Sequence, residues 1–235
     1  PDAISYSSVI NAFGKTAKPA DAAAWFRRME AAGLRADTVA YNSVIDAFNK
    51  AKQPDQATAW LQRLEASGAR ANKVSYNSVI DAWGKAKQPT KAAEWLARMQ
   101  ACGVKPDEVS YALAIDAFAK ARAPDEAAKW LERMEQAGFK PDVYSSVVGA
   151  YCKAKQPVEA AHWLERMESA GVMPNEVCYN SVIHAYGKST KPEEAALWLS
   201  RMEAAGVAPN EVSYNIVIDA MARSPKDLLY QAEYL

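Results

Sequence analysis

A segment of eight residues that recurs along the chain constrains its fold more than any other feature. The segment YNSVIDAF begins at Tyr41, and related segments begin at six further tyrosines: Tyr6, Tyr76, Tyr111, Tyr144, Tyr179 and Tyr214. The spacing between successive copies is 35 residues, except before Tyr144, where it is 33. A period of this length is typical of supersecondary units that stack side by side, because one such unit alone cannot bury a hydrophobic core.

We therefore predict a single all-α solenoid over residues 1–235, built from about seven stacked helix–turn–helix repeats. The predicted repeats span about 3–37, 38–72, 73–107, 108–142, 143–175 and 176–210, with a partial repeat over 211–235. After Met221 the turn is shorter and the segment LLYQAEYL lacks the Trp-Leu pair of the other repeats. We expect a cap or a cut-off repeat there.

Each repeat is predicted to form two amphipathic helices, as the second repeat shows. Its first helix is expected from about Thr38 to Lys50. The apolar residues of this helix follow the i, i+3, i+4, i+7 spacing and are Tyr41, Val44, Ile45 and Phe48. Pro54 suits the first position of a second helix, where its missing N–H costs nothing, and Gly68 suits the left-handed residue after that helix.

The bulky residues of the second helices are predicted to form the core. The tryptophans could instead stack on bases, but each lies on the apolar face, where burial of an indole removes about 200 Å² from water. These tryptophans are Trp25, Trp60, Trp95, Trp130, Trp163 and Trp198. The methionines on the same face are expected to fill gaps and are Met29, Met99, Met134, Met167 and Met202. An alanine in each first helix would let neighbouring helices approach closely; these are Ala12, Ala47, Ala82, Ala117, Ala150, Ala185 and Ala220.

A second face of each first helix is left over once the apolar face is turned inward. In the second repeat a helical wheel places these residues on it: Val39, Asn42, Asp46, Asn49 and Lys50. Across the repeats the face begins with an aliphatic residue: Ile4, Val39, Val74, Val109, Val177 and Val212. It ends with a cation: Lys15, Lys50, Lys85, Lys120, Lys153, Lys188 and Arg223.

Stacking would align this face into a hydrophobic row, a hydrogen-bonding row and a positive row, which suits single-stranded nucleic acid. Aliphatic side chains hold splayed bases, amide and hydroxyl groups reach base edges, and ammonium groups contact phosphates. The alternative is a solvated helix face, because lysine in a last turn and Asn or Ser in a first turn are ordinary helix chemistry. A row of exposed valines favours binding, since soluble proteins rarely leave a long apolar ribbon uncovered. Because Asp46, Asp81, Asp116 and Asp219 lie beside the face, we expect the strand to run nearer the lysines.

Charge and composition limit the other possible functions. Lys plus Arg equals Asp plus Glu at 28 each, so a nucleic-acid surface must come from local clustering. The cysteines Cys102, Cys152 and Cys178 lack CxxC spacing, so we expect no metal and no cofactor. His162 and His184 lie in different repeats, and no phosphate loop, nucleophile elbow or paired-carboxylate motif is present. No apolar run is long enough for a membrane span. We therefore predict a binding protein and not an enzyme.

The repeat resembles that of the pentatricopeptide repeat family. The 35-residue period, the Tyr-Asn start of the first helix, the Lys at its end and the Pro-Asp junctions carry the resemblance over nearly the whole chain. Tetratricopeptide repeats are a near neighbour, but their period is about 34 and their Trp and Gly-Tyr pattern is absent. The resemblance implies a right-handed superhelical solenoid that binds single-stranded RNA in a mitochondrion or chloroplast, in RNA processing, stability or translation. A structural or adaptor subunit that packs against proteins or ribosomal RNA in a large organellar assembly is the alternative.

The resemblance also implies that two side chains per repeat read one base. They are the residue after the first-helix Tyr and the last residue of the repeat. On this chain the pairs are Ser7 with Asp37, Asn42 with Asn72, Asn77 with Asp107, Ala112 with Asp142, Ser145 with Asn175, and Asn180 with Asn210, while Asn215 has no partner. Read 5′ to 3′, the pairs lean to G, pyrimidine, U, any base, A and pyrimidine. Ala112 cannot hydrogen-bond a base, and the gap before Tyr144 removes or displaces the aliphatic wedge of the fifth repeat and puts Asp142 in doubt.

The first residues, Pro1-Asp2, repeat the junction dipeptide found at Pro106-Asp107. We therefore expect the chain to be a piece of a longer protein, and a removed targeting segment would lie outside it.

Overall fold

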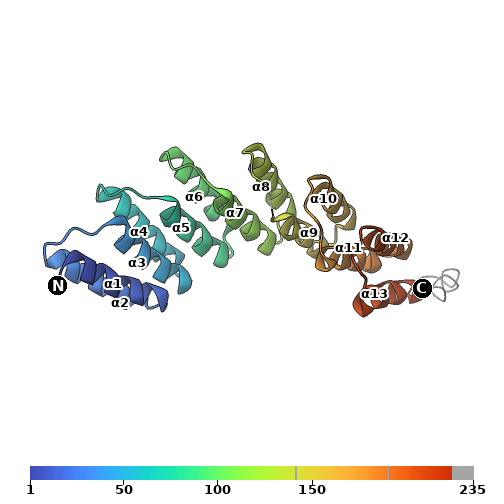
Figure 1. Cartoon of the computed structure of the whole chain (residues 1–235), viewed down its shortest axis with the longest axis horizontal. Helices are drawn as coiled ribbons and strands as arrows, with labels where there is room; N and C mark the ends of the chain where they lie inside the picture. The colour runs from blue at the N-terminus through green and yellow to red at the C-terminus, as the bar shows by residue number, and fades with distance from the viewer. Residues whose placement is uncertain (141, 190, 224–235) are drawn as a thin grey trace. The chain divides into compact units, whose positions relative to one another are not determined.

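The computed structural model describes residues 1–140, 142–189 and 191–223. Over these ranges the chain forms thirteen α-helices and no β-strand (Figure 1), which confirms the predicted all-α repeat architecture. The helices group into two compact units, Pro1–Ala121 (unit 1) and Arg122–Leu235 (unit 2). The predicted cap or cut-off repeat after Arg223 lies outside the described residues.

Unit 1 is a two-layer stack of seven helices. They are α1 (Ala3–Lys15), α2 (Pro19–Ala31), α3 (Thr38–Lys50), α4 (Pro54–Ala66), α5 (Lys73–Lys85), α6 (Pro89–Ala101) and α7 (Glu108–Lys120). The odd-numbered helices pack on one another in chain order, and each even-numbered helix packs on the odd-numbered helices before and after it. The first helices of successive repeats therefore form one layer and the second helices the other.

Unit 2 has the same arrangement over six helices. They are α8 (Pro124–Gln136), α9 (Tyr144–Lys153), α10 (Pro157–Ser169), α11 (Glu176–Lys188), α12 (Pro192–Ala204) and α13 (Glu211–Ala222). Helix α11 packs between α9 and α13, while α8, α10 and α12 form the second layer.

Proline and glycine set the ends of the second helices, as predicted. Each even-numbered helix begins with proline, where no intrahelical partner for an N–H is needed. After α4, Gly68 has φ of 76°, a left-handed conformation that glycine adopts without steric strain. These two residue types confine every second helix to one length.

The predicted core is largely confirmed. Trp60, Trp95, Trp163 and Trp198 are buried, whereas Trp25 and Trp130 are partly exposed. All five methionines of the second helices are buried. An arginine one turn later lies over each of the six indoles, with guanidinium-to-ring distances of 4.3–5.0 Å. The indoles are therefore used for packing and for cation–π contact within the protein.

Small residues bring neighbouring first helices close together. A side-chain Cβ at Gly84 would lie 3.2 Å from the Cβ of Ala117, and one at Gly187 would lie 3.1 Å from that of Ala220. At Gly14 the nearest atom would be the backbone oxygen of Ser43, at 2.6 Å. The recurring alanines are buried in every copy except Ala12, as stacking requires.

The fifth repeat lacks the first turn of its first helix. Helix α9 begins at Tyr144 itself and has 10 residues, whereas the other first helices have 13 residues or, at α13, 12. Its N-cap, Val143, makes no side-chain cap hydrogen bond. The 33-residue spacing therefore removes the turn that carries the aliphatic wedge in the other repeats.

Candidate nucleic-acid interface

The six aliphatic residues at the start of the first helices lie exposed, as the helical wheel predicts. Their exposed fractions range from 55% to 75%. In unit 1 they are Ile4, Val39, Val74 and Val109, and in unit 2 they are Val177 and Val212. Their exposure leaves the first-helix layer of each unit with apolar side chains that nothing within the described residues covers.

The last residue of every complete repeat except the fourth proves to be the N-cap of the next first helix; after the fourth repeat the N-cap is Val143 instead of Asp142. Asp37 Oδ1 accepts a hydrogen bond from the backbone N–H of Ala40 at 2.9 Å. The same cap is formed by Asn72, Asp107, Asn175 and Asn210. This contact satisfies one free N–H of the helix and fixes the direction of the side chain. The predicted base-reading residues are therefore held in place by the fold.

In the second and third pairs, both in unit 1, the cap also binds the other predicted reader of the same pair. Asn42 Nδ2 donates to Asn72 Oδ1 at 3.2 Å, and Asn77 Nδ2 donates to Asp107 Oδ1 at 3.3 Å. The structure thus brings the second and third predicted pairs together.

Two serines that the sequence reasoning missed complete this contact. Ser75 Oγ donates to Asn42 Oδ1 at 2.6 Å, and Ser110 Oγ donates to Asn77 Oδ1 at 2.7 Å. Both serines are fully buried, and each follows directly after an exposed valine. Serine three residues after the cap is a capping-box pattern, so the sequence carried a signal for them.

At Asp107 and Asn72, the cap leaves one polar atom of the side chain outside these hydrogen bonds. Asp107 Oδ1 is used by the cap and by Asn77, while Oδ2 lies 3.7 Å from Lys73 Nζ. Burial acts to raise the pKa of Asp107, but hydrogen bonds from Ser110 and Asn77 and the charge of Lys73 together hold it below its ordinary value. Asp107 therefore presents an ionised acceptor. Asn72 uses Oδ1 in the same way and keeps its Nδ2 as a donor.

The first predicted pair lines a hollow of about 280 Å³ in unit 1. Its wall includes both readers, Ser7 and Asp37, and both flanking aliphatic residues, Ile4 and Val39. The side chains proposed to read a base and those proposed to hold it therefore share one hollow.

The later pairs differ from this arrangement. In the fifth pair, Ser145 is exposed and Asn175 caps α11. In the sixth pair, Asn180 and Asn210 both donate to Glu176 Oε1, at 3.4 and 2.5 Å. Sequence reasoning missed Glu176, an acidic residue beside two readers.

The remaining readers are placed but not paired. Ala112 is half-buried on α7, Asp142 is exposed before α9, and Asn215 is exposed on α13. Ala112 belongs to unit 1 and Asp142 to unit 2, so the fourth pair stays a prediction.

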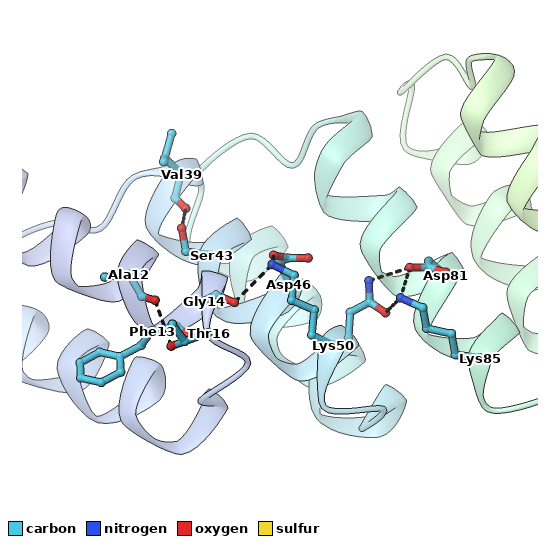
Figure 2. Close-up of polar contacts among 11 residues, drawn as sticks. Ala12, Phe13, Gly14, Thr16, Val39, Ser43, Asp46, Lys50, Asp81 and Lys85 are labelled. Atoms are coloured by element: carbon cyan, nitrogen blue, oxygen red, sulfur yellow. Dashed lines mark hydrogen bonds and ion pairs between the residues drawn. The ribbon is translucent and has the colours of Figure 1, made fainter.

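Three of the four lysines that end first helices of unit 1 are held by aspartates one turn earlier. The pairs are Lys50 with Asp46, Lys85 with Asp81, and Lys120 with Asp116, each with 2.6 Å between nitrogen and carboxylate oxygen. Figure 2 shows Lys50 also directed at the carbonyl of Gly14, at 3.4 Å. The predicted positive row is therefore not separate from the aspartates in unit 1. The D-x-x-x-K spacing is the sequence signal that could have indicated these pairs.

The predicted exposure of Asn49 is wrong. Asn49 is only 5% exposed, its Nδ2 donates to Asp81 Oδ2 at 2.9 Å, and its Oδ1 accepts from Lys85 Nζ at 3.2 Å. A wheel drawn for one helix omits α5, which packs against this side of α3.

The lysines of unit 2 lack such aspartates. Gly149 stands one turn before Lys153, and His184 stands one turn before Lys188. Neither lysine forms an ion pair with any residue that the structure describes. Arg223, by contrast, is paired with Asp219. In unit 1, Lys15 likewise follows Asn11 and has no ion pair within the described ranges.

Metal and membrane sites are not indicated in the part of the chain that the structure describes. No group of three or more His, Cys, Asp or Glu side chains there could hold a metal ion. None of the helices in these ranges has the length and hydrophobicity needed to cross a bilayer.

These features define a helical-repeat protein whose first helices carry an exposed apolar and polar face. The sequence profile of the PPR repeat family matches residues 1–50, 71–120 and 174–223, and that of the PPR repeat matches residues 39–68, 109–139 and 142–172. The chain belongs to the pentatricopeptide repeat family. No curated protein sequence matches it.

Solved structures show the same fold. The crystal structure of the pentatricopeptide repeat protein PPR10 from maize is 28% identical with a TM-score of 0.77, covering 100% of this chain and 34% of that chain. This chain thus spans about a third of the maize protein. Nuclear proteinaceous RNase P 2 from A. thaliana is 15% identical with a TM-score of 0.68, covering 80% of this chain and 43% of that chain. The PPR domain of A. thaliana protein-only RNase P 1 is 13% identical with a TM-score of 0.64, covering 76% of this chain and 95% of that chain.

Proposed function

We propose that this protein binds single-stranded RNA with base selectivity, one base per repeat, as a binding protein and not an enzyme. One observation supports the proposal most strongly. The predicted readers Asn42 with Asn72, and Asn77 with Asp107, are already joined by hydrogen bonds between the first helix of the repeat and its last residue. An exposed valine lies one helical turn before each asparagine, so a base can contact both.

The cap determines whether the second reader of each repeat offers a base a hydrogen-bond donor or an acceptor. When Oδ1 is held by the helix, an aspartate presents Oδ2, an acceptor, and an asparagine presents Nδ2, a donor. The ring nitrogens of G and U on the Watson–Crick edge carry a hydrogen, whereas those of A and C accept one. Asp37 and Asp107 therefore select G or U, and Asn72 and Asn175 select A or C.

The first reader decides between purine and pyrimidine by size. Asn42 and Asn77 are longer than Ser7 and Ser145 and fill the space that the second ring of a purine needs. Combining the two readers gives G for Ser7 with Asp37 and U for Asn77 with Asp107. The same combination narrows the predicted pyrimidine at Asn42 with Asn72 to C and gives A at Ser145 with Asn175. The full site is then G, C, U, any base, A and pyrimidine.

The rest of the face supplies affinity. Exposed aliphatic residues pack on the faces of the splayed bases, and cations at the ends of the first helices contact phosphates. Lys15, Lys153 and Lys188 are available for this contact in the described structure, whereas Lys50 must first leave Asp46. We expect moderate affinity that falls with salt.

Related proteins support an RNA ligand. The maize protein PPR10 has been crystallised in complex with an 18-nt psaJ RNA element, and the PPR domain of RNase P 1 with tRNA. Family membership also leads us to propose a location in a mitochondrion or chloroplast and a role in RNA processing, stability or translation there.

The test is a binding titration with two labelled strands of identical composition, GCUAAC and CACUGA, at two salt concentrations. The first strand satisfies every predicted pair and the second violates all five selective ones. We expect GCUAAC to bind at least about tenfold more tightly, since each mismatch costs about 1 kcal/mol and two of the five mismatches already exceed the roughly 1.4 kcal/mol of a tenfold difference. Equal affinity for the two strands would refute base reading.

A second candidate function is an adaptor that packs against proteins in a larger assembly. It is favoured by one observation, the pairing of the unit 1 lysines Lys50, Lys85 and Lys120 with aspartates on their own helices. Equal and weak binding of both strands, unaffected by salt, is the outcome that this function predicts.

A further inference from the structure

Unit 2 contains a hollow of about 680 Å³ beside α9, α11 and the end of α13. It lies away from the base-reading pairs, since neither member of any pair lines it. This volume falls within the range of small-molecule sites, about 300–1,000 Å³.

Four cations line this hollow: Lys153, Lys155, Lys188 and Arg223. The three lysines have no ion pair among the residues that the structure describes, while the charge of Arg223 is balanced by Asp219. No aspartate or glutamate lines the hollow. The wall therefore carries an excess of about three positive charges.

The negative partial charges at the C-termini of two helices repel an anion in this hollow, but this repulsion is weaker than the attraction by the lysines. Helices α9 and α11 end at Lys153 and Lys188, and each C-terminus contributes about half a negative charge. Two such ends amount to about one negative charge, against three lysines. The net field in the hollow is thus positive.

The sequence explains why this charge appears in unit 2. In unit 1 the residue one turn before the last lysine of α3, α5 and α7 is Asp46, Asp81 or Asp116, and each forms an ion pair. In unit 2 the corresponding residues are Gly149 and His184, and both line the hollow. Loss of the carboxylate both frees the lysine and opens space beside it.

We propose that this hollow is an anion site that binds a phosphate group and, when RNA is bound, fixes one phosphate of the strand more firmly than the other repeats do. The role in RNA binding rests on the proposed function, but the site itself does not. It binds inorganic phosphate in the absence of RNA. Repeats five and six, which present the least regular readers, then supply the main electrostatic anchor.

The two histidines of the chain can serve as an NMR probe of the hollow and its internal control. His184 lines the hollow, whereas His162 lies exposed on α10 and does not line it. Burial, Lys188 and Arg223 lower the pKa of His184, so a bound anion that offsets these cations will raise it. Facing His184 are Cys152, Lys153 and Lys155 from α9 and the turn after it, and Arg223 from the end of α13. The full chain is titrated with inorganic phosphate at constant ionic strength while NMR follows both imidazoles.

We expect the His184 resonances to shift and saturate, with no saturable change at His162. Gly149→Asp restores the carboxylate found in unit 1, and a Cβ at Gly149 meets no atom within 4 Å, so the variant should fold. It should abolish the saturable shift. Gln62→Glu, which adds the same charge at an exposed position of α4, should leave the shift unchanged.

The outcomes separate this inference from the proposed function. An unsaturable shift, or equal shifts at both histidines, would overturn the anion site even if GCUAAC binds selectively. A saturable shift at His184 that Gly149→Asp removes would establish the site even if neither RNA strand binds. Retention of the shift in Gly149→Asp would show that the lysines do not hold the anion.

Discussion

Units 1 and 2 have the same helix pairs and the same family of lysines, yet they differ in what those lysines do. In unit 1, Lys50, Lys85 and Lys120 each bind an aspartate one turn earlier. In unit 2, Lys153 and Lys188 line an open hollow instead. The lysine in the same place of the repeat is therefore neutralised at three positions of unit 1 and free of an ion pair at Lys153 and Lys188 within the described part of unit 2.

A single side chain, four residues earlier, decides between these two states. An exposed i, i+4 ion pair stabilises a helix by only about 0.3–0.5 kcal/mol. That energy is too small to matter for folding, but a phosphate must compete with the aspartate for the lysine. The number of cations available to RNA therefore cannot be obtained by counting lysines.

The packing of first helices differs most between Gly14 of unit 1 and Gly149 of unit 2. A Cβ at Gly14 of unit 1 would lie 2.6 Å from the backbone oxygen of Ser43, whereas one at Gly149 of unit 2 meets nothing within 4 Å. We expect Gly14→Ala to lower the free energy of unfolding by about 1–3 kcal/mol. Gly149→Ala should raise it by about 0.5–1 kcal/mol, because alanine favours the helix. Urea unfolding of the two variants checks this, and a stabilised Gly14→Ala would contradict the close packing of α1 on α3.

Alkaline pH should weaken contacts that unit 2 makes between tyrosine and carboxylate. Burial and a hydrogen bond to Glu135 raise the pKa of Tyr144 to about 12, and burial and Asp125 raise that of Tyr151 to about 12. Because the folded-state pKa is raised, this stability is complete below the ordinary tyrosine pKa of about 10 and is lost as the pH rises to about 12. We expect the urea midpoint to fall over that window.

The matched variant is Tyr144→Phe with Tyr151→Phe. It should be less stable at neutral pH by about 1 kcal/mol per hydrogen bond, and its midpoint should change less between pH 10 and 12. An equal loss in both proteins would show that other groups cause the alkaline transition.

Releasing the unit 1 lysines from their aspartates should change RNA binding by a small amount for each lysine released. Asp46→Asn, Asp81→Asn and Asp116→Asn remove the charge that holds each lysine and keep the shape of the side chain. Each further phosphate that a released lysine neutralises should steepen the slope of log K against log salt by about 0.7. Titrations at several salt concentrations measure the slope, and an unchanged slope in the triple variant would mean that the strand does not approach these lysines.

Much of this structure could be predicted from the sequence, because its signals are local to one helix. The helix pairs, the proline and glycine ends, the buried Met99 and the exposed Val39 all follow from spacing within one repeat. Contacts between repeats could not be predicted in the same way. Asn49 is buried because α5 covers it, and Glu176 on α11 binds Asn210, the N-cap of α13. The lysine pairs are a different case, since the D-x-x-x-K spacing was local and visible.

The central claim is that the cap fixes one atom of the second reader and that the remaining atom selects the base. The most direct test uses four strands that differ only at the third base of GCUAAC, bound by the wild-type protein and by the variant with Asn77→Ser and Asp107→Asn. The variant keeps an N-cap at residue 107, exchanges the acceptor for a donor and makes room for a purine. The account predicts that the preferred third base changes from U to A. An unchanged preference for U, with the fold intact, would contradict it.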